Sequence, residues 1–124
     1  DGGTRTAAIT GAYVALSLAI KRMEARGDCS PGVLSEPISA ISVGIVQGEV
    51  VVDLNYVEDS SADVDMNVVM QAGGKLIEVQ GTAEKATFNR RELDSMLDGA
   101  DYACQKIFIA QEEAIQTGLR ARPE

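Results

Sequence analysis

The stretch that decides the fold runs over residues 63–70 and reads DVDMNVVM. Its side chains alternate between polar and apolar, which is the period-two pattern of a strand with one buried face. The sequence therefore predicts a strand that supplies a core on one side and a polar surface on the other. The expected buried face carries Val64, Met66, Val68 and Met70, and the polar face carries Asp63, Asp65 and Asn67.

Three further strands are predicted around this one. Residues 41–45 and 50–56 show a similar alternation, and Gln47-Gly48 between them favours a tight turn. Ala72-Gly73-Gly74 is a hairpin signal, after which residues 75–80 return as the fourth strand. The short connections favour an antiparallel meander, with the sheet spanning residues 38–82.

Helices are predicted before and after the sheet. Within residues 1–27, apolar side chains recur at helical spacing beside a stripe of alanines that would let another element approach closely. Residues 89–118 predict C-terminal helices that begin with a capping-box-like Asn89 and Glu92 and could break near Asp98-Gly99. The expected fold class is α+β, a mainly antiparallel four-stranded sheet with helices on one face. The first helix face carries Ile9, Tyr13, Leu16, Ile20 and Met23.

The composition limits the kind of function. With 124 residues, 45% of them hydrophobic, the chain fits one globular domain. No apolar run is long enough to span a bilayer and no signal peptide is visible, so we expect a cytoplasmic protein without membrane contact. Cys29 and Cys104 lie in unlike settings and are expected to be reduced thiols. The first residue is not Met, which indicates a fragment or a trimmed chain.

Charge and residue types restrict the chemistry further. A formal net charge of −8 disfavours independent binding of nucleic acid, because polyanions are gathered by Lys and Arg. The chain contains no histidine. A site must therefore use carboxylates, Arg, Lys, hydroxyls, backbone groups or a metal ion.

Two constellations of residues could carry chemistry. Gly3, Thr4 and Arg5 are expected directly before the first helix, where backbone N–H groups, a hydroxyl and a guanidinium suit an inorganic phosphate ion. Glycine and threonine also simply start many helices. Asp59 and Asp65 belong to an acidic cluster whose hard oxygens suit Mg²⁺ or Mn²⁺. The same cluster could instead be a solvated strand edge.

The sequence leaves the role of a third feature open. Glu78 and Gln80 share a face of the fourth strand and could reach a site or face solvent. The phosphate cradle and the carboxylate pair are together compatible with metal-assisted phosphoryl transfer.

Five motifs, in this order along nearly the whole chain, resemble ribonuclease PH. The resemblance implies the ribosomal protein S5 domain 2-like fold and a phosphate-dependent 3′→5′ exoribonuclease. Such an enzyme trims the 3′ ends of tRNA precursors and releases nucleoside 5′-diphosphates. The motifs are DGGTRTAAITGA at 1–12, ISVG at 41–44, DLNY at 53–56 with EDS at 58–60, VDMNVVM at 64–70 and EVQGTAE at 78–84.

The same resemblance implies roles for particular residues. Gly3, Thr4 and Arg5 would hold the attacking phosphate, which is a co-substrate. Asp59 and Asp65 would be the catalytic carboxylates and the ligands of Mg²⁺ or Mn²⁺. Family members assemble as homo-oligomers, a hexameric ring built as a trimer of dimers.

The chain departs from the family in length, because it covers only about the second half of a typical member. The resemblance implies that the other half supplies a further arginine for phosphate and much of the basic surface that contacts RNA. We therefore expect this chain to be inactive or nearly inactive in isolation. Two alternatives stay open: a catalytically inactive scaffold or RNA-binding subunit of an exosome-like ring, and hydrolytic instead of phosphorolytic cleavage.

Overall fold

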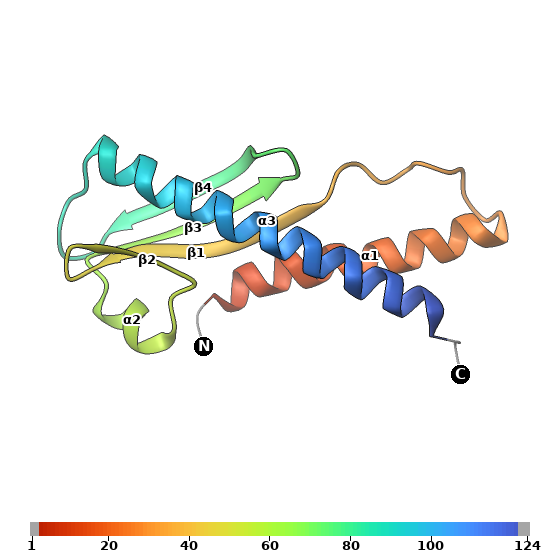
Figure 1. Cartoon of the computed structure of the whole chain (residues 1–124), viewed down its shortest axis with the longest axis horizontal. Helices are drawn as coiled ribbons and strands as arrows, with labels where there is room; N and C mark the ends of the chain where they lie inside the picture. The colour runs from red at the N-terminus through yellow and green to blue at the C-terminus, as the bar shows by residue number, and fades with distance from the viewer. Residues whose placement is uncertain (1–2, 122–124) are drawn as a thin grey trace.

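The computed structural model describes residues 3–121, in which the chain forms three helices and four strands (Figure 1). Asp1 and Gly2, which begin the first motif, lie outside the described residues, as do residues 122–124. In chain order the elements are α1 (Thr4–Arg26), β1 (Ile38–Val46), β2 (Glu49–Val52), α2 (Tyr56–Ser61), β3 (Val64–Gln71), β4 (Lys75–Ala83) and α3 (Arg90–Arg120).

The four strands form one sheet in the order β2-β1-β3-β4, and every neighbouring pair is antiparallel. This confirms the predicted α+β class and the antiparallel pairing. The predicted meander was wrong, because β3 pairs with β1 and leaves β2 at the edge of the sheet. β1 and β3 are the central strands, and their register places Gly44 opposite Asp65 and Ser42 opposite Asn67. Directly opposed residues share a face of the sheet, so these four lie on one side.

The core lies between the other side of the sheet and α3, which crosses over the strands (Figure 1). The predicted inward face of β3 is confirmed, because its four apolar side chains are almost fully buried. They pack with residues of β1 and with one stripe of α3, where burial of apolar surface stabilises the fold. The cluster includes Val43, Val64, Met66, Val68, Met70, Met96, Ala100 and Cys104.

The prediction of more than one C-terminal helix was wrong. α3 is a single helix of 31 residues that starts at the predicted capping box of Asn89 and Glu92. Gly99 does not break it. A Cβ atom at residue 99 would come within 2.8 Å of the Val52 side chain, so the glycine allows α3 to lie close to β2.

The second predicted strand ends earlier than expected. β2 stops at Val52, and Asp53 adopts a left-handed backbone conformation with φ 61°. The chain then turns back across the sheet and forms the short helix α2. The prediction extended this strand to residue 56 because apolar residues continue to alternate there. In the structure, Leu54 is buried against β1 and Tyr56 already begins α2.

The first turns of α1 lie beside β1, at the part of this strand with which the shorter β2 does not pair. The Thr10 hydroxyl accepts a hydrogen bond from the Ala40 N–H at 3.2 Å. On α3, the Gln111 amide donates to the carbonyl oxygens of Thr10 at 3.0 Å and Ile38 at 2.8 Å. One side chain thus ties α1, β1 and α3 together. Beyond the sheet, the Arg22 guanidinium donates to the Gly118 carbonyl oxygen of α3.

The predicted apolar face of α1 is only partly buried. The helix fully buries Thr6 and Ser17, whereas the Leu16 side chain is 51% exposed. The alanine stripe is also exposed. Ala12 lines a shallow apolar hollow, together with apolar side chains of α1 that were predicted to be buried in the core. The reason is that α1 contacts β1 and α3 along one side. The other residues of the hollow are Ile9, Tyr13, Leu16 and Ile38.

Between residues 3 and 121, no helix combines the length and apolarity that a membrane crossing requires.

Candidate active site

A polar cavity of about 200 Å³ lies on the sheet face that α3 leaves uncovered. It brings together the five residues predicted to bind phosphate or a metal ion, which come from the start of α1, from α2 and from β3. Ser42 and Asn67 form part of its floor, and the exposed ring of Tyr56 stands at its edge. The complete lining is Gly3, Thr4, Arg5, Ser42, Tyr56, Asp59, Asp65 and Asn67.

The start of α1 forms one wall of this cavity. Gly3 is the N-cap residue and has a left-handed φ of 72°. A side chain there would collide with the Thr6 hydroxyl, which donates to the Gly3 carbonyl oxygen at 2.7 Å. No side chain caps the helix among the described residues. The N–H groups of the first turn and the positive end of the helix dipole therefore remain available to an anion.

Asp59 is positioned by α2, a helix of six residues. The Asn55 side chain accepts a hydrogen bond from the Glu58 N–H at 3.0 Å, and the Glu58 carboxylate accepts one from the Asn55 N–H at 2.9 Å. This reciprocal capping box holds the first turn of α2. The Asp59 N–H bonds to the Asn55 carbonyl oxygen at 2.8 Å, so the cap fixes the backbone of the carboxylate residue itself.

The segment before α2 rests on the sheet at Gly44. Leu54 is fully buried, and its N–H donates to the Ser42 hydroxyl at 3.1 Å. A Cβ atom at residue 44 would lie 2.9 Å from the Leu54 side chain and would also collide with the Val64 carbonyl group. The absence of a side chain at Gly44 thus lets the chain cross the sheet directly beside Asp65, which Gly44 opposes in the register.

Asp65 projects from β3 onto the same face, as strand alternation predicted. Burial raises the pKa of its carboxyl group, and the negative charges of Asp59 and Glu84 raise it further, while a hydrogen bond from the Met66 N–H acts in the opposite direction. Asp59, Asp65 and Glu84 also line a neighbouring hollow of about 300 Å³ together with Lys85. Sequence reasoning did not select Glu84, although it ends the EVQGTAE motif.

The other acidic residue of this strand has a different place. Asp63 lines neither hollow. Its backbone connects the ends of β1, β3 and β4. The Asp63 N–H donates to the Ile45 carbonyl oxygen at 2.8 Å, and its own carbonyl oxygen accepts from the Glu84 N–H at 2.9 Å.

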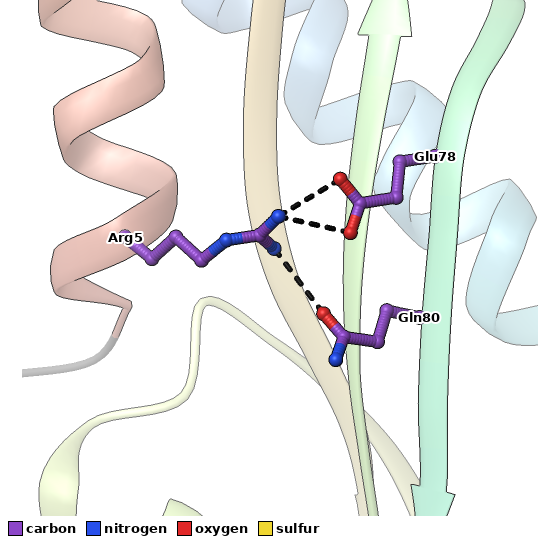
Figure 2. Close-up of polar contacts among 3 residues, drawn as sticks. All are labelled: Arg5, Glu78 and Gln80. Atoms are coloured by element: carbon purple, nitrogen blue, oxygen red, sulfur yellow. Dashed lines mark hydrogen bonds and ion pairs between the residues drawn. The ribbon is translucent and has the colours of Figure 1, made fainter.

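Arg5 reaches from α1 across the polar face of the sheet to β4 (Figure 2). One guanidinium nitrogen, Nη2, donates to both carboxylate oxygens of Glu78 at 2.9 and 2.8 Å. The other, Nη1, donates to the Gln80 amide oxygen at 3.3 Å. Glu78 and Gln80 thus contact Arg5, a candidate phosphate-binding residue, although neither lines the cavity and Gln80 is exposed.

The donor set suits a hard divalent cation. Within residues 3–121, no group of three or more His, Cys, Asp or Glu side chains is arranged to hold a metal ion. Mg²⁺ commonly takes only one or two carboxylates and completes its shell with water and substrate phosphate. Asp59 and Asp65 lie in one cavity and repel each other electrostatically, so a cation between them and a phosphate group would reduce that repulsion.

The matching family model and the most similar proteins indicate the same family. The family described as "3′ exoribonuclease family, domain 2" matches residues 36–100. Ribonuclease PH of Corynebacterium glutamicum is 53% identical over 115 residues, which cover 93% of this chain and 47% of that protein. Ribonuclease PH of Mycolicibacterium smegmatis is 59% identical over 116 residues, covering 93% and 45% respectively. The chain thus spans about half the length of the curated relatives it matches.

Two solved structures share the fold. Rice Rrp46 superposes with a TM-score of 0.57 at 19% identity and covers 65% of this chain and 38% of its own. A chain of the Archaeoglobus fulgidus exosome, solved with RNA bound to the active site, superposes with a TM-score of 0.54 at 16% identity. That match covers 61% of this chain and 30% of the exosome chain.

Proposed function

Since the chain belongs to the 3′ exoribonuclease family, we propose that it supplies part of a phosphorolytic active site. In this reaction, inorganic phosphate attacks the 3′-terminal phosphodiester of RNA and releases a nucleoside 5′-diphosphate. The observation that carries the proposal is a cavity that joins the start of α1, which no side chain of residues 3–121 caps, to the carboxylates of Asp59 and Asp65. Phosphoryl transfer needs this combination of an anion site and negatively charged groups that can hold a cation.

The attacking phosphate binds at Gly3, Thr4 and Arg5. Backbone N–H groups of the first helical turn donate to its oxygens, with the Thr4 hydroxyl as a further donor. The Arg5 guanidinium adds positive charge and a planar set of donors suited to phosphate geometry. These groups orient the nucleophile, which removes much of the entropic cost of bringing two anions together.

Asp59 and Asp65 would hold Mg²⁺ or Mn²⁺, which would supply positive charge to offset that of the phosphate oxygens. The carboxyl group of Asp65 has a pKa above its ordinary value. Without a cation, the Asp65 carboxyl group therefore binds a proton more readily than an ordinary aspartate. A bound cation would act in the opposite direction and keep the group ionised, so that it could accept a proton from the attacking phosphate.

The RNA itself needs positive charge that this chain does not provide, because its net charge is −8. We place those cations in the part of the polypeptide that the relatives have and this chain does not span, and in neighbouring subunits of a hexameric ring. The substrate proposed on the family relationship is the 3′ end of tRNA precursors, processed in the cytoplasm.

The test is the identity of the released nucleotide. The complete polypeptide is incubated with a short 3′-labelled RNA and Mg²⁺, with and without inorganic phosphate. We expect nucleoside 5′-diphosphate, released at a rate that rises with phosphate concentration. Nucleoside 5′-monophosphate formed without phosphate would identify a hydrolase, and RNA binding without turnover would identify a scaffold subunit.

A further inference from the structure

The partners of Arg5 are unexpected for a phosphate-binding arginine. Arg5 lines the cavity that contains the carboxylates of Asp59 and Asp65. Its hydrogen bonds within the described chain nevertheless go to Glu78 and Gln80, on the far edge of the sheet (Figure 2). The guanidinium group is thus held at a distance from α1 by Glu78 and Gln80. These two residues line neither the cavity nor the neighbouring hollow that contains Glu84 and Lys85.

The contact leaves part of the guanidinium group available. Of its five N–H donors, those on Nη2 serve both oxygens of the Glu78 carboxylate, and one on Nη1 serves the Gln80 amide oxygen. Within residues 3–121, the Nε–H and one Nη1–H make no hydrogen bond, so the group can donate to an anion without leaving β4. An arginine held in this way is oriented before its ligand arrives.

A β-bulge makes the contact possible. Pairing between β3 and β4 shifts by one residue between Val69 and Met70. Without this shift, Val69 would oppose Ile77, and Glu78 and Gln80 would point to the opposite face of the sheet. With the shift, Glu78 opposes Val69 and Gln80 opposes Asn67, so both side chains lie on the face that holds the cavity.

The ion pair contributes little to folding. The side chains of Arg5 and Glu78 are 50% and 38% exposed, and ion pairs at such exposed positions are weak. Its main consequence is therefore the location of the guanidinium group. If Glu78 were neutral, the remaining anions beside Arg5 in the described part of the cavity would be Asp59 and Asp65. Pairing with them would occupy both the phosphate donor and the proposed cation ligands.

We propose that Glu78 and Gln80 are positioning residues that hold Arg5 for the attacking phosphate and keep it from pairing with Asp59 and Asp65. The inference rests on the proposed function. At saturating phosphate the anion itself attracts the guanidinium group, so losing the β4 contact affects phosphate binding more than the rate of the chemical step.

The experiment compares the complete polypeptide with its Glu78→Gln variant, measuring phosphorolysis of a short RNA over a range of phosphate concentrations. We expect the KM for inorganic phosphate to rise on the order of tenfold, because a binding group is misplaced. We expect kcat to change by less than about threefold. Glu49→Gln, which removes the same charge from the exposed start of β2, is the matched control and leaves both constants unchanged.

A double-mutant cycle tests whether Glu78 acts through Arg5. In an Arg5→Lys background, the Glu78→Gln change should raise the KM for phosphate far less than in the wild type. A KM that is unchanged or lower in Glu78→Gln would overturn the inference, since a lower KM means that Glu78 merely competes with phosphate. An additive cycle would also overturn it. These outcomes leave the proposed function intact, which fails only if the wild type shows no phosphate-dependent release of nucleoside diphosphate.

Discussion

The Asp65 carboxyl group is partly buried on the polar face of β3, with the charges of Asp59 and Glu84 close enough to raise its pKa. Folding therefore makes the carboxylate form less favourable than it is in the unfolded chain. The folded state binds this proton more tightly, so the free energy of unfolding decreases as the pH rises from the ordinary aspartate pKa through the raised one. At neutral pH, the group that we assign to catalysis lowers stability.

Asp65→Asn separates the two effects. We expect kcat for phosphorolysis to fall by about a hundredfold or more, as is usual when a proton-transfer group is lost. We also expect the free energy of unfolding at pH 7 to be no lower than that of the wild type, with the difference between the two proteins shrinking toward pH 3. Urea titrations at several pH values measure this. Asp63→Asn, two residues away and outside both hollows, should retain activity. Equal losses in both variants would remove Asp65 from the mechanism.

At this scale, alternation along residues 63–70 was enough to predict which side of β3 faces the core and which faces the candidate site. It could not reveal the contacts of Arg5 with β4. Counting outward from the turn at residues 72–74 without the bulge puts Glu78 and Gln80 on the wrong face, because a one-residue shift exchanges the two faces of a strand. A bulge of this kind leaves no reliable signal in a single sequence.

Two elements of the chain begin with the same Asn-x-x-Glu capping box, at Asn55 and at Asn89. The sequence identified the second box, because a long amphipathic pattern follows it. The first was missed, because apolar alternation through residues 50–56 favoured a strand and α2 is only six residues long. The continuous α3 was missed for a related reason: Gly99 was interpreted by its propensity, whereas its contact with Val52 depends on tertiary packing.

The paired caps provide a test of how Asp59 is held. Asn55→Ala and Asn89→Ala each remove one N-cap, and each should lower the free energy of unfolding by about 1 kcal/mol. Only Asn55→Ala loosens the helix that carries Asp59, so we expect it alone to reduce phosphorolysis, on the order of tenfold. Denaturant unfolding and initial rates on a short RNA give both quantities. Equal activity in the two variants would show that the Asn55 cap does not position Asp59.

Over the whole molecule, the family and the α+β fold were predicted correctly from the ordered motifs and the alternating strands. The packing of α1 was not. The spacing of its apolar residues predicted that these residues would be buried. The residues that α1 buries against β1 and α3 are instead Thr6 and Ser17. The side chain that joins these elements, Gln111, appeared in the sequence only as a polar residue within an apolar stripe. Its partners lie 101 and 73 residues away along the chain.

Gln111→Leu tests this junction. The substitution leaves the carbonyl oxygens of Thr10 and Ile38 without their buried donor, which should lower the free energy of unfolding by about 1–3 kcal/mol. Gln116→Leu on the same helix is the control. It removes an exposed hydrogen bond to Glu112 and should cost less than about 0.5 kcal/mol. Urea-induced unfolding, followed by circular dichroism, measures both. Similar costs in the two variants would mean that Gln111 does not hold α1 to the sheet.

The strict alternation along β3 also bears on errors in folding. If β3 paired with β1 one residue out of register, Asp65 and Asn67 would face Met96, and the methionines and valines of the core would face water. Such a misfolded chain would lose its hydrophobic core and its carboxylate pair in the same event. Misregistered molecules would therefore be recognisable as unfolded protein, and a well-folded population would contain few inactive members.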